Sequence, residues 1–210
     1  MNGIWKNCTS ALESEAFGID YVRMRTVAAL ILLLAFSSRS SPAEQILEGF
    51  TTVSGTGFAF ELKAPRGWFL DDGAAHEQGL KVVFYPRDTS WDSSPAVCYV
   101  QVRTLDNRVR RVEDQVQDTL QNLRQHGEAT PRARLLRVIT TQDASKAQVY
   151  QITGIQSGTE EAVAYVQGKS SIHFITLSAR DPAAFKTAWA AFESLVSSYE
   201  DLTQPAPANG

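Results

Sequence analysis

The side chains of this sequence that could do chemistry gather in one short stretch between two predicted strands. Asp71, Asp72 and Glu77 supply carboxylates and His76 supplies an imidazole. Oxygen and nitrogen donors this close together could hold a divalent cation, for metal binding or metal-dependent hydrolysis. Their spacing matches neither an EF-hand loop nor an HExxH helix. Because Asp-Gly is a common turn pair, we favour a solvated loop over 71–79 and keep the metal site as the alternative.

Three aromatic residues form a second candidate site, for a ligand or a partner protein. Trp68 and Tyr85 stand at predicted strand ends, and Trp91 lies in a polar loop beside Ser90 and Asp92. Aromatic side chains in such places either form a binding surface or cap the core, and we favour capping. Of the three, Trp91 is the one that we expect to be exposed. The binding surface would then be formed by the loops 65–79 and 86–95.

The sequence holds no signature of a catalytic nucleophile. GxSxG and SxxK motifs are missing, and no Cys/His pair has a supporting context. Cys98 alternates in phase with apolar residues and should point into the core. His173, between Ile172 and Phe174, should be a buried, hydrogen-bonded histidine. We therefore predict no catalytic residue and no cofactor, and favour a protein that is not an enzyme.

Charge excludes one class of partner. The chain has 20 Lys and Arg against 23 Asp and Glu, a net charge of −3, and its cations are dispersed apart from Arg108, Arg110 and Arg111. A nucleic-acid-binding protein needs a broad basic face, so we expect no nucleic-acid partner. We expect the arginine cluster to lie at the start of a helix.

An export signal is predicted near the N-terminus. Arg23 and Arg25 precede an apolar run over 27–36, and Ser41 and Ala43 are placed like the −3 and −1 positions of a cleavage site. Ten helical residues span about 15 Å, half of the roughly 30 Å of a bilayer core. We expect a periplasmic or extracellular protein with no stable membrane span after cleavage. An uncleaved signal that anchors the protein is the minority alternative.

The domain boundaries follow from this signal. Residues 1–43 are an upstream segment plus signal peptide, and Met24 could be the true start because residues 1–20 carry more acid than base. Residues 44–200 suit a single globular domain, which has enough chain for a proper core. The tail 201–210 is rich in Pro and polar residues, and we predict that it is disordered.

Hydrophobic periodicity predicts seven strands and two main helices in that domain. The apolar stripe from Val109 to Leu123 predicts a helix over about 109–126, capped by Asn107 and ended by Gly127. Asp181 and Pro182 begin a second helix. The seven strands are predicted at 58–64, 80–85, 96–103, 135–141, 147–153, 161–167 and 171–179, and residues 68–70 form a short extended segment.

This element order predicts an α+β fold. The strands come in runs joined by hairpins, which favours an antiparallel sheet of about six to seven strands flanked by two main helices over a Rossmann fold. Val163 and Val166, or Ile172 and Ile175, are apolar on both faces of their strands. Such strands should lie centrally, with both sides of the sheet covered.

The pattern of motifs resembles one known superfamily. A strand ends in Ala64-Pro65-Arg66-Gly67-Trp68, another ends in Phe84-Tyr85-Pro86, a Ser90-Trp91 loop follows, and the last helix ends in Leu195-Val196-Ser197-Ser198-Tyr199. Over roughly 55–200 this resembles the PsbP and Mog1-like α/β/α sandwich superfamily. The resemblance implies the fold and a non-enzymatic binding or assembly role, and it transfers no catalytic residue. The expected partner is an envelope protein or a small ligand.

Overall fold

The computed structural model describes residues 49–128, 130–155 and 158–203, which form two antiparallel sheets and three helices. The predicted signal peptide, the rest of 1–43 and residues 204–210 of the predicted tail lie outside the described residues. In chain order the elements are β1 (Phe50–Gly55), β2 (Phe58–Lys63), β3 (Trp68–Leu70), α2 (Asp72–Glu77), β4 (Val82–Pro86), β5 (Ala96–Thr104), α3 (Val112–Gln125), β6 (Arg132–Thr140), β7 (Lys146–Thr153), β8 (Glu160–Gln167), β9 (Ser171–Ala179), α4 (Pro182–Ser197) and β10 (Glu200–Asp201).

The larger sheet has seven strands in the order β3-β4-β5-β9-β8-β7-β6, and every neighbouring pair is antiparallel. The strands β6 to β9 follow one another as hairpins, and β9 then pairs along nine residues with β5. This pairing joins the two halves of the chain in the middle of the sheet. The predicted antiparallel α+β fold is confirmed.

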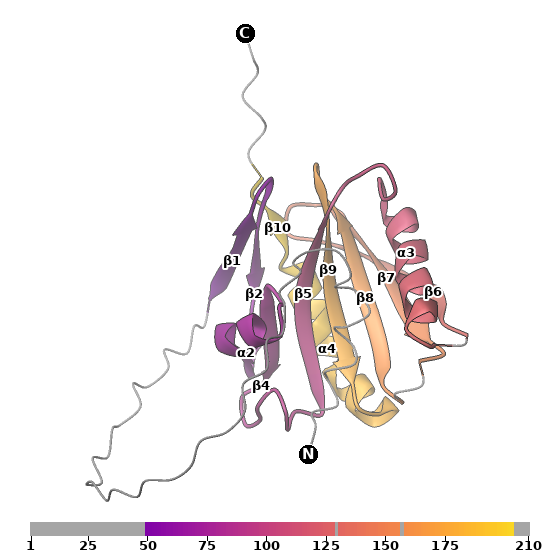
Figure 1. Cartoon of the computed structure of the whole chain (residues 1–210). Helices are drawn as coiled ribbons and strands as arrows, with labels where there is room; N and C mark the ends of the chain where they lie inside the picture. Colours follow the sequence, from indigo (N-terminus) through magenta and orange to yellow (C-terminus); the bar gives the residue numbers. More distant parts are fainter. Residues whose placement is uncertain (1–48, 129, 156–157, 204–210) are drawn as a thin grey trace, which may run out of the picture.

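Both faces of the central strands are covered, as their sequences predicted. All nine residues of β9 are buried, and so are Val163 and Val166 on opposite faces of β8. Figure 1 shows α4 behind the sheet, with α2 and α3 in front of it. The molecule is thus a sandwich in which the sheet is the middle layer.

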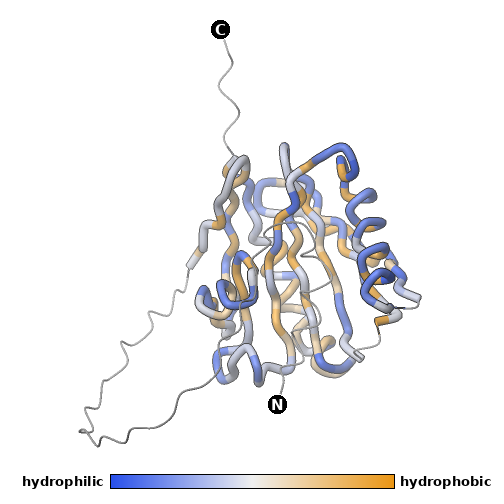
Figure 2. Tube along the Cα trace, viewed as in Figure 1, coloured by the Kyte–Doolittle hydropathy of each residue, from blue (hydrophilic) through white to orange (hydrophobic). Residues whose placement is uncertain are grey.

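The face behind the sheet is covered by α4 together with the small sheet, whose order is β1-β2-β10. The Asp181 carboxylate caps α4 by accepting hydrogen bonds from the N–H groups of Ala183 and Ala184 at 2.9 and 2.8 Å, and Pro182 begins the helix, as predicted. Phe192, Leu195 and Val196 of α4 are fully buried against the sheet. In Figure 2 the tube of α3 is mostly in the hydrophilic colour, whereas that of α4 carries more of the hydrophobic colour.

The opposite face is covered by α3 over β7, β8 and β9, and by α2 over β4 and β5. Helix α3 begins later than predicted, with Arg111 rather than Asn107 as its N-cap residue. The reason is a turn ahead of the helix, in which the Asp106 carboxylate accepts hydrogen bonds from the Arg108 and Val109 N–H groups, both at 2.7 Å. The predicted glycine end is confirmed, because Gly127 has φ of 97°.

Three short elements differ from the sequence prediction. Helix α2 replaces the loop expected over 71–79, because the Asp71 carboxylate caps its first turn and Ala75 packs into the core. Strand β1 forms a hairpin with β2, and β10 pairs with the other side of β2.

Within the described residues, no helix is long and apolar enough to cross a membrane.

A buried polar network fixes the small sheet to the large one. His173 of β9 has no exposed surface; its Nε2 lies 2.7 Å from the Ser171 hydroxyl and its Nδ1 lies 2.7 Å from the Tyr199 hydroxyl. The Phe60 ring of β2 stacks on the imidazole, with ring centres 4.4 Å apart. The prediction of a buried, hydrogen-bonded histidine is therefore confirmed.

Burial also sets the protonation of the core groups. It lowers the pKa of His173 to about 4, although the charge of Asp201 opposes the shift, and it raises the pKa of the Cys98 thiol. Cys98 has no exposed surface and packs under α4, so the predicted core position of this cysteine is confirmed. A protonated thiol in an apolar core is a poor nucleophile.

The neutral His173 predicts a loss of stability in acid. Between pH 6.5 and 4 the unfolded chain binds a proton at this imidazole that the folded chain does not bind, so the free energy of unfolding falls as pH falls through this window. The shift corresponds to roughly 3 kcal/mol. Urea unfolding measured across this range should show the fall in the wild-type protein and a shallower one in His173→Gln.

The exposed histidine of α2 gives the matched control. His76→Gln should keep the wild-type pH dependence, because this exposed residue lies outside the His173 network and its replacement leaves that network intact. If His173→Gln and the wild type lost stability with the same slope, the buried histidine would not be the group that titrates.

Candidate functional site

The side chains of the predicted metal site do not converge. Asp71 uses one carboxylate oxygen to accept the Ala74 N–H at 2.8 Å and the other to accept the Tyr85 hydroxyl, while Asp72, His76 and Glu77 are polar residues of a one-and-a-half-turn helix. In 49–128, 130–155 and 158–203, no group of three or more His, Cys, Asp or Glu side chains could hold a metal ion. The metal-binding alternative stays a prediction that this geometry does not support.

The three predicted aromatic residues lie in two different cores. Trp68, Tyr85 and Trp91 are at most 8% exposed, so the favoured prediction of core capping is confirmed and the expected exposure of Trp91 is wrong. Trp68 packs on the α4 side of the sheet, whereas Tyr85 and Trp91 pack under α2, since neighbouring strand positions point to opposite faces. They share no surface, and among them only Trp68 lines the cleft described next.

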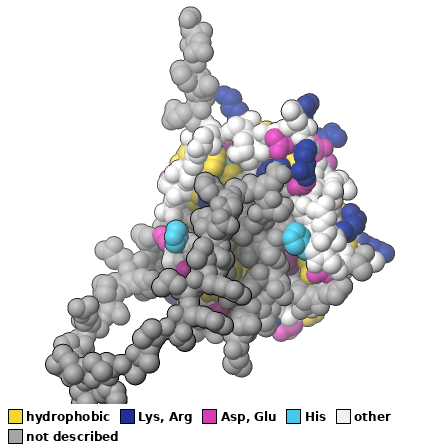
Figure 3. Space-filling view, viewed as in Figure 1, with side chains coloured by type: hydrophobic (Ala, Val, Ile, Leu, Met, Phe, Trp, Pro, Cys, Tyr) yellow, Lys and Arg dark blue, Asp and Glu magenta, His cyan; other side chains and the backbone are white. Residues whose placement is uncertain are grey.

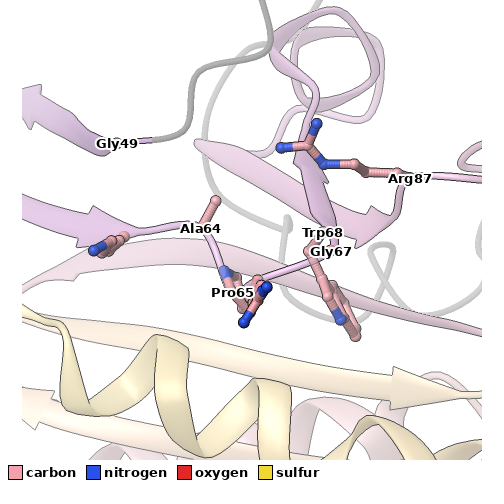
Figure 4. A pocket seen from close by; sticks show the side chains of 8 residues that line it. Gly49, Ala64, Pro65, Gly67, Trp68 and Arg87 are labelled. Carbon is pink, nitrogen blue, oxygen red and sulfur yellow. The ribbon is translucent and has the colours of Figure 1, made fainter.

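An open cleft of about 510 Å³ lies where strand ends of the two sheets meet. Its lining residues come from the start of β1, the end of β2, the turn into β3 and the end of β4, and they are Gly49, Lys63, Ala64, Pro65, Arg66, Gly67, Trp68 and Arg87. Figure 4 shows the Arg87 side chain reaching from the end of β4 towards the side where Gly49 and Ala64 lie, while the Trp68 indole points away towards α4.

The local sequence dictates the turn that shapes this cleft. The Trp68 N–H donates to the Pro65 carbonyl at 2.9 Å, which closes a four-residue turn with Arg66 at its apex. Gly67 has φ of 79°, the left-handed conformation that the third position of a type II turn needs. The Gly67 carbonyl in turn accepts the Arg87 N–H at 3.1 Å. The backbone therefore holds both arginines at the same opening.

The cleft is cationic. Lys63, Arg66 and Arg87 line it, and none of its lining residues is acidic. Within the part of the chain that the structure describes, no carboxylate forms an ion pair with Lys63 or Arg66. The Lys63 backbone is fixed by its N–H, which donates to the Ser198 hydroxyl at 2.9 Å at the end of α4. The site therefore presents cations from a rigid frame.

An exposed aromatic ring borders the cleft. Phe50 pairs with Lys63 across the β1–β2 hairpin, is 44% exposed, and has the Lys63 ammonium 5.7 Å from its ring centre. The binding surface predicted from sequence, on loops 65–79 and 86–95, includes Arg66 and Arg87 but neither Lys63 nor Phe50. Strand β1 was not predicted, and its pairing with β2 is what brings Phe50 beside the lysine.

Comparisons with known proteins bear on the fold. The structure is similar to that of cyanobacterial PsbP (CyanoP) from Synechocystis sp. PCC 6803, at 15% identity and a TM-score of 0.48, over 77% of this chain and 98% of that one. It is also similar to the Ran-binding protein Mog1p of Saccharomyces cerevisiae, at 12% identity and a TM-score of 0.45, over 73% and 95%. A mutant form of Mog1 gives 12% identity and a TM-score of 0.44, over 72% and 95%.

The predicted PsbP and Mog1-like resemblance is confirmed as a likeness of fold. At this identity and these TM-scores, the similarity says nothing about ligands or partners. No protein-family model matches the chain, and no curated protein matches it in sequence.

The two roles considered for Asp71 predict different stability changes. Asp71 caps α2 and accepts a hydrogen bond from the Tyr85 hydroxyl. Asp71→Ala should therefore lower the free energy of unfolding by about 1–2 kcal/mol. Glu77→Ala, at the exposed end of the same helix, should change it by less than about 0.5 kcal/mol. Urea denaturation measures both. A metal site would instead show stabilisation by added Zn²⁺ or Ca²⁺ that either substitution abolishes.

Proposed function

We propose that this chain is an exported, non-enzymatic binding protein that holds an anionic group of its ligand in the cationic cleft, the opening lined by Lys63, Arg66 and Arg87. The observation that carries the proposal is the charge of the cleft. Three cations line one opening, none of its lining residues is acidic, and Lys63 and Arg66 form no ion pair with a described carboxylate. Because the chain as a whole has a net charge of −3, this local excess of positive charge favours a site that attracts anions.

The residue types specify the chemistry of the bound group. A guanidinium presents a planar fork of N–H donors that matches a carboxylate or a phosphate, and the lysine adds a compact point charge. We therefore expect the ligand to offer a carboxylate or phosphate group. Phe50, exposed beside Lys63, supplies apolar surface for a part of the ligand attached to that group.

The same lining favours binding over catalysis. Besides the three cations, the cleft is lined by glycine, alanine, proline and tryptophan. These residues offer neither a nucleophile nor a general acid or base near neutral pH. A ligand held there would be recognised rather than transformed.

The exported location is supported by the sequence pattern alone, with its basic start, short apolar run and small-residue cleavage site. In that location the ligand would be met in the periplasm or outside the cell. N-terminal sequencing of the protein from the native cell should give a product that begins at Glu44. A cytosolic product that retains Met1 would contradict export.

Thermal unfolding with small dianions tests the cleft. Inorganic phosphate or succinate should raise the midpoint of the wild-type protein above its value in sodium chloride of matched ionic strength, because a ligand that binds only the folded state stabilises it. Comparing the two anions distinguishes a phosphate from a carboxylate ligand. Lys63→Gln/Arg66→Gln should lose the stabilisation.

Arg110→Gln/Lys186→Gln provides the control, since it removes two exposed cations that do not line the cleft and should respond as the wild type does. Equal stabilisation of all three proteins, or of none, would overturn the proposed site.

A further inference from the structure

Strand β6 forms a long outer edge of the seven-stranded sheet. It runs over nine residues and pairs with β7 alone, so no strand among the described residues lies on its other side. The opposite edge is formed by β3, which has three residues. Backbone N–H and C=O groups along an edge strand can pair with a further strand.

A bulge places the three arginines of β6 on one face of the sheet. The register with β7 shifts between Leu135 and Arg137, which reverses the direction in which the following side chains point. Arg137 is therefore on the same face as Arg132 and Arg134, the α4 side of the sheet, and it forms an ion pair with Glu193 of α4. All three arginines of the strand share this face.

The two exposed apolar residues of β6, Leu135 and Val138, share the other face, whereas Ile139 packs into the core on the α4 side. Leu135 is paired with Tyr150 and Val138 with Gln148, and the Tyr150 hydroxyl donates to the Gln148 side chain at 3.0 Å on the α3 side. Leu135 is 49% exposed and Val138 is 52% exposed. They are two of the three large hydrophobic residues exposed within the described ranges, and the third is Phe50 of the cleft.

The edge keeps an excess of positive charge. No carboxylate of a described residue forms an ion pair with Arg132 or Arg134, and the Arg134 guanidinium donates instead to the neutral Gln151 amide at 2.9 Å. Strand β6 itself contains no acidic residue. In Figure 3, Lys and Arg side chains stand out on the right side of the molecule, where α3 and β6 lie in Figure 1.

We propose that β6 is a docking edge for an extended acidic segment of a partner protein, which adds to the sheet as a further strand. Because side chains alternate along a strand, such a segment would place carboxylates on the face of Arg132 and Arg134 and apolar residues on the face of Leu135 and Val138. Main-chain hydrogen bonds supply affinity, and the two faces supply specificity.

The alternative occupant, a second copy of this chain, is disfavoured by charge. Pairing β6 with itself would bring two arginine-rich strands together without any carboxylate from either strand. Arginines and a bulge are also common protection against aggregation at sheet edges. Protection against aggregation explains the arginines, but it does not explain the exposed Leu135 and Val138 on the same strand. A partner strand that carries both acidic and apolar residues explains the two features together.

A labelled synthetic peptide of alternating Glu and Val tests the docking edge by fluorescence anisotropy with the full chain. The wild-type protein should bind this peptide and should not bind one of alternating Lys and Val. Arg132→Glu/Arg134→Glu should weaken binding by at least about tenfold. Arg110→Glu/Lys186→Glu, with the same change in net charge on exposed sites elsewhere, should bind as the wild type does.

Hydrogen exchange locates the contact. Bound Glu/Val peptide should slow exchange of amides in β6 and leave those of β3, at the other edge, unchanged. No binding by the wild-type protein, equal binding by both charge-reversed variants, or protection away from β6 would overturn the proposal. Sedimentation that showed a dimer dissociated by Leu135→Lys would also overturn it, because the occupant would then be a second copy. The cleft variant Lys63→Gln/Arg66→Gln should bind the peptide normally, which separates this test from that of the proposed function.

Discussion

All nine residues of strand β9 are buried, and the rest of the fold follows from that constraint. A strand buried on both faces needs a cover on each side of the sheet. Helices α2 and α3 cover one side, and α4 together with the small sheet covers the other. His173 of β9 lies within hydrogen-bond distance of the hydroxyl of Tyr199, just after α4, and stacks on Phe60 of β2, so one buried imidazole joins the central strand to both parts of the second cover. The cleft lies where this cover meets the edge of the large sheet.

The features that could be predicted from sequence were those with a local cause. The apolar residues on both faces of β8 and β9 predicted a central position for these strands, and Asp181-Pro182 predicted the start of α4. The short elements were missed because tertiary contacts stabilise them. Helix α2 forms over Asp-Gly-rich sequence because Asp71 caps it and Ala75 finds a core, and β1 and β10 exist through their pairing with β2. The exposure of Trp91 was misjudged because its polar neighbours in sequence are not its neighbours in space.

The same distinction applies to the candidate site. Arg66 and Gly67 were visible in the sequence as a break between strands, but their partnership with Lys63 and Arg87 depends on how two sheets meet. Among the described residues, cations without a carboxylate partner lie both in the cleft, with Lys63 and Arg66, and at the β6 edge, with Arg132 and Arg134. Exposed hydrophobic side chains lie beside both. Both places combine a charged contact with an apolar one, which is the character expected of surfaces that recognise partners and ligands.

The central claim is that the cationic cleft binds an anionic group. Nuclear magnetic resonance of ¹⁵N-labelled protein, titrated with inorganic phosphate and succinate at constant ionic strength, tests it most directly. The account predicts saturable changes of amide chemical shift in residues 63–68 and at Arg87. Shifts spread over the surface without saturation, or confined to segments outside the cleft, would contradict it.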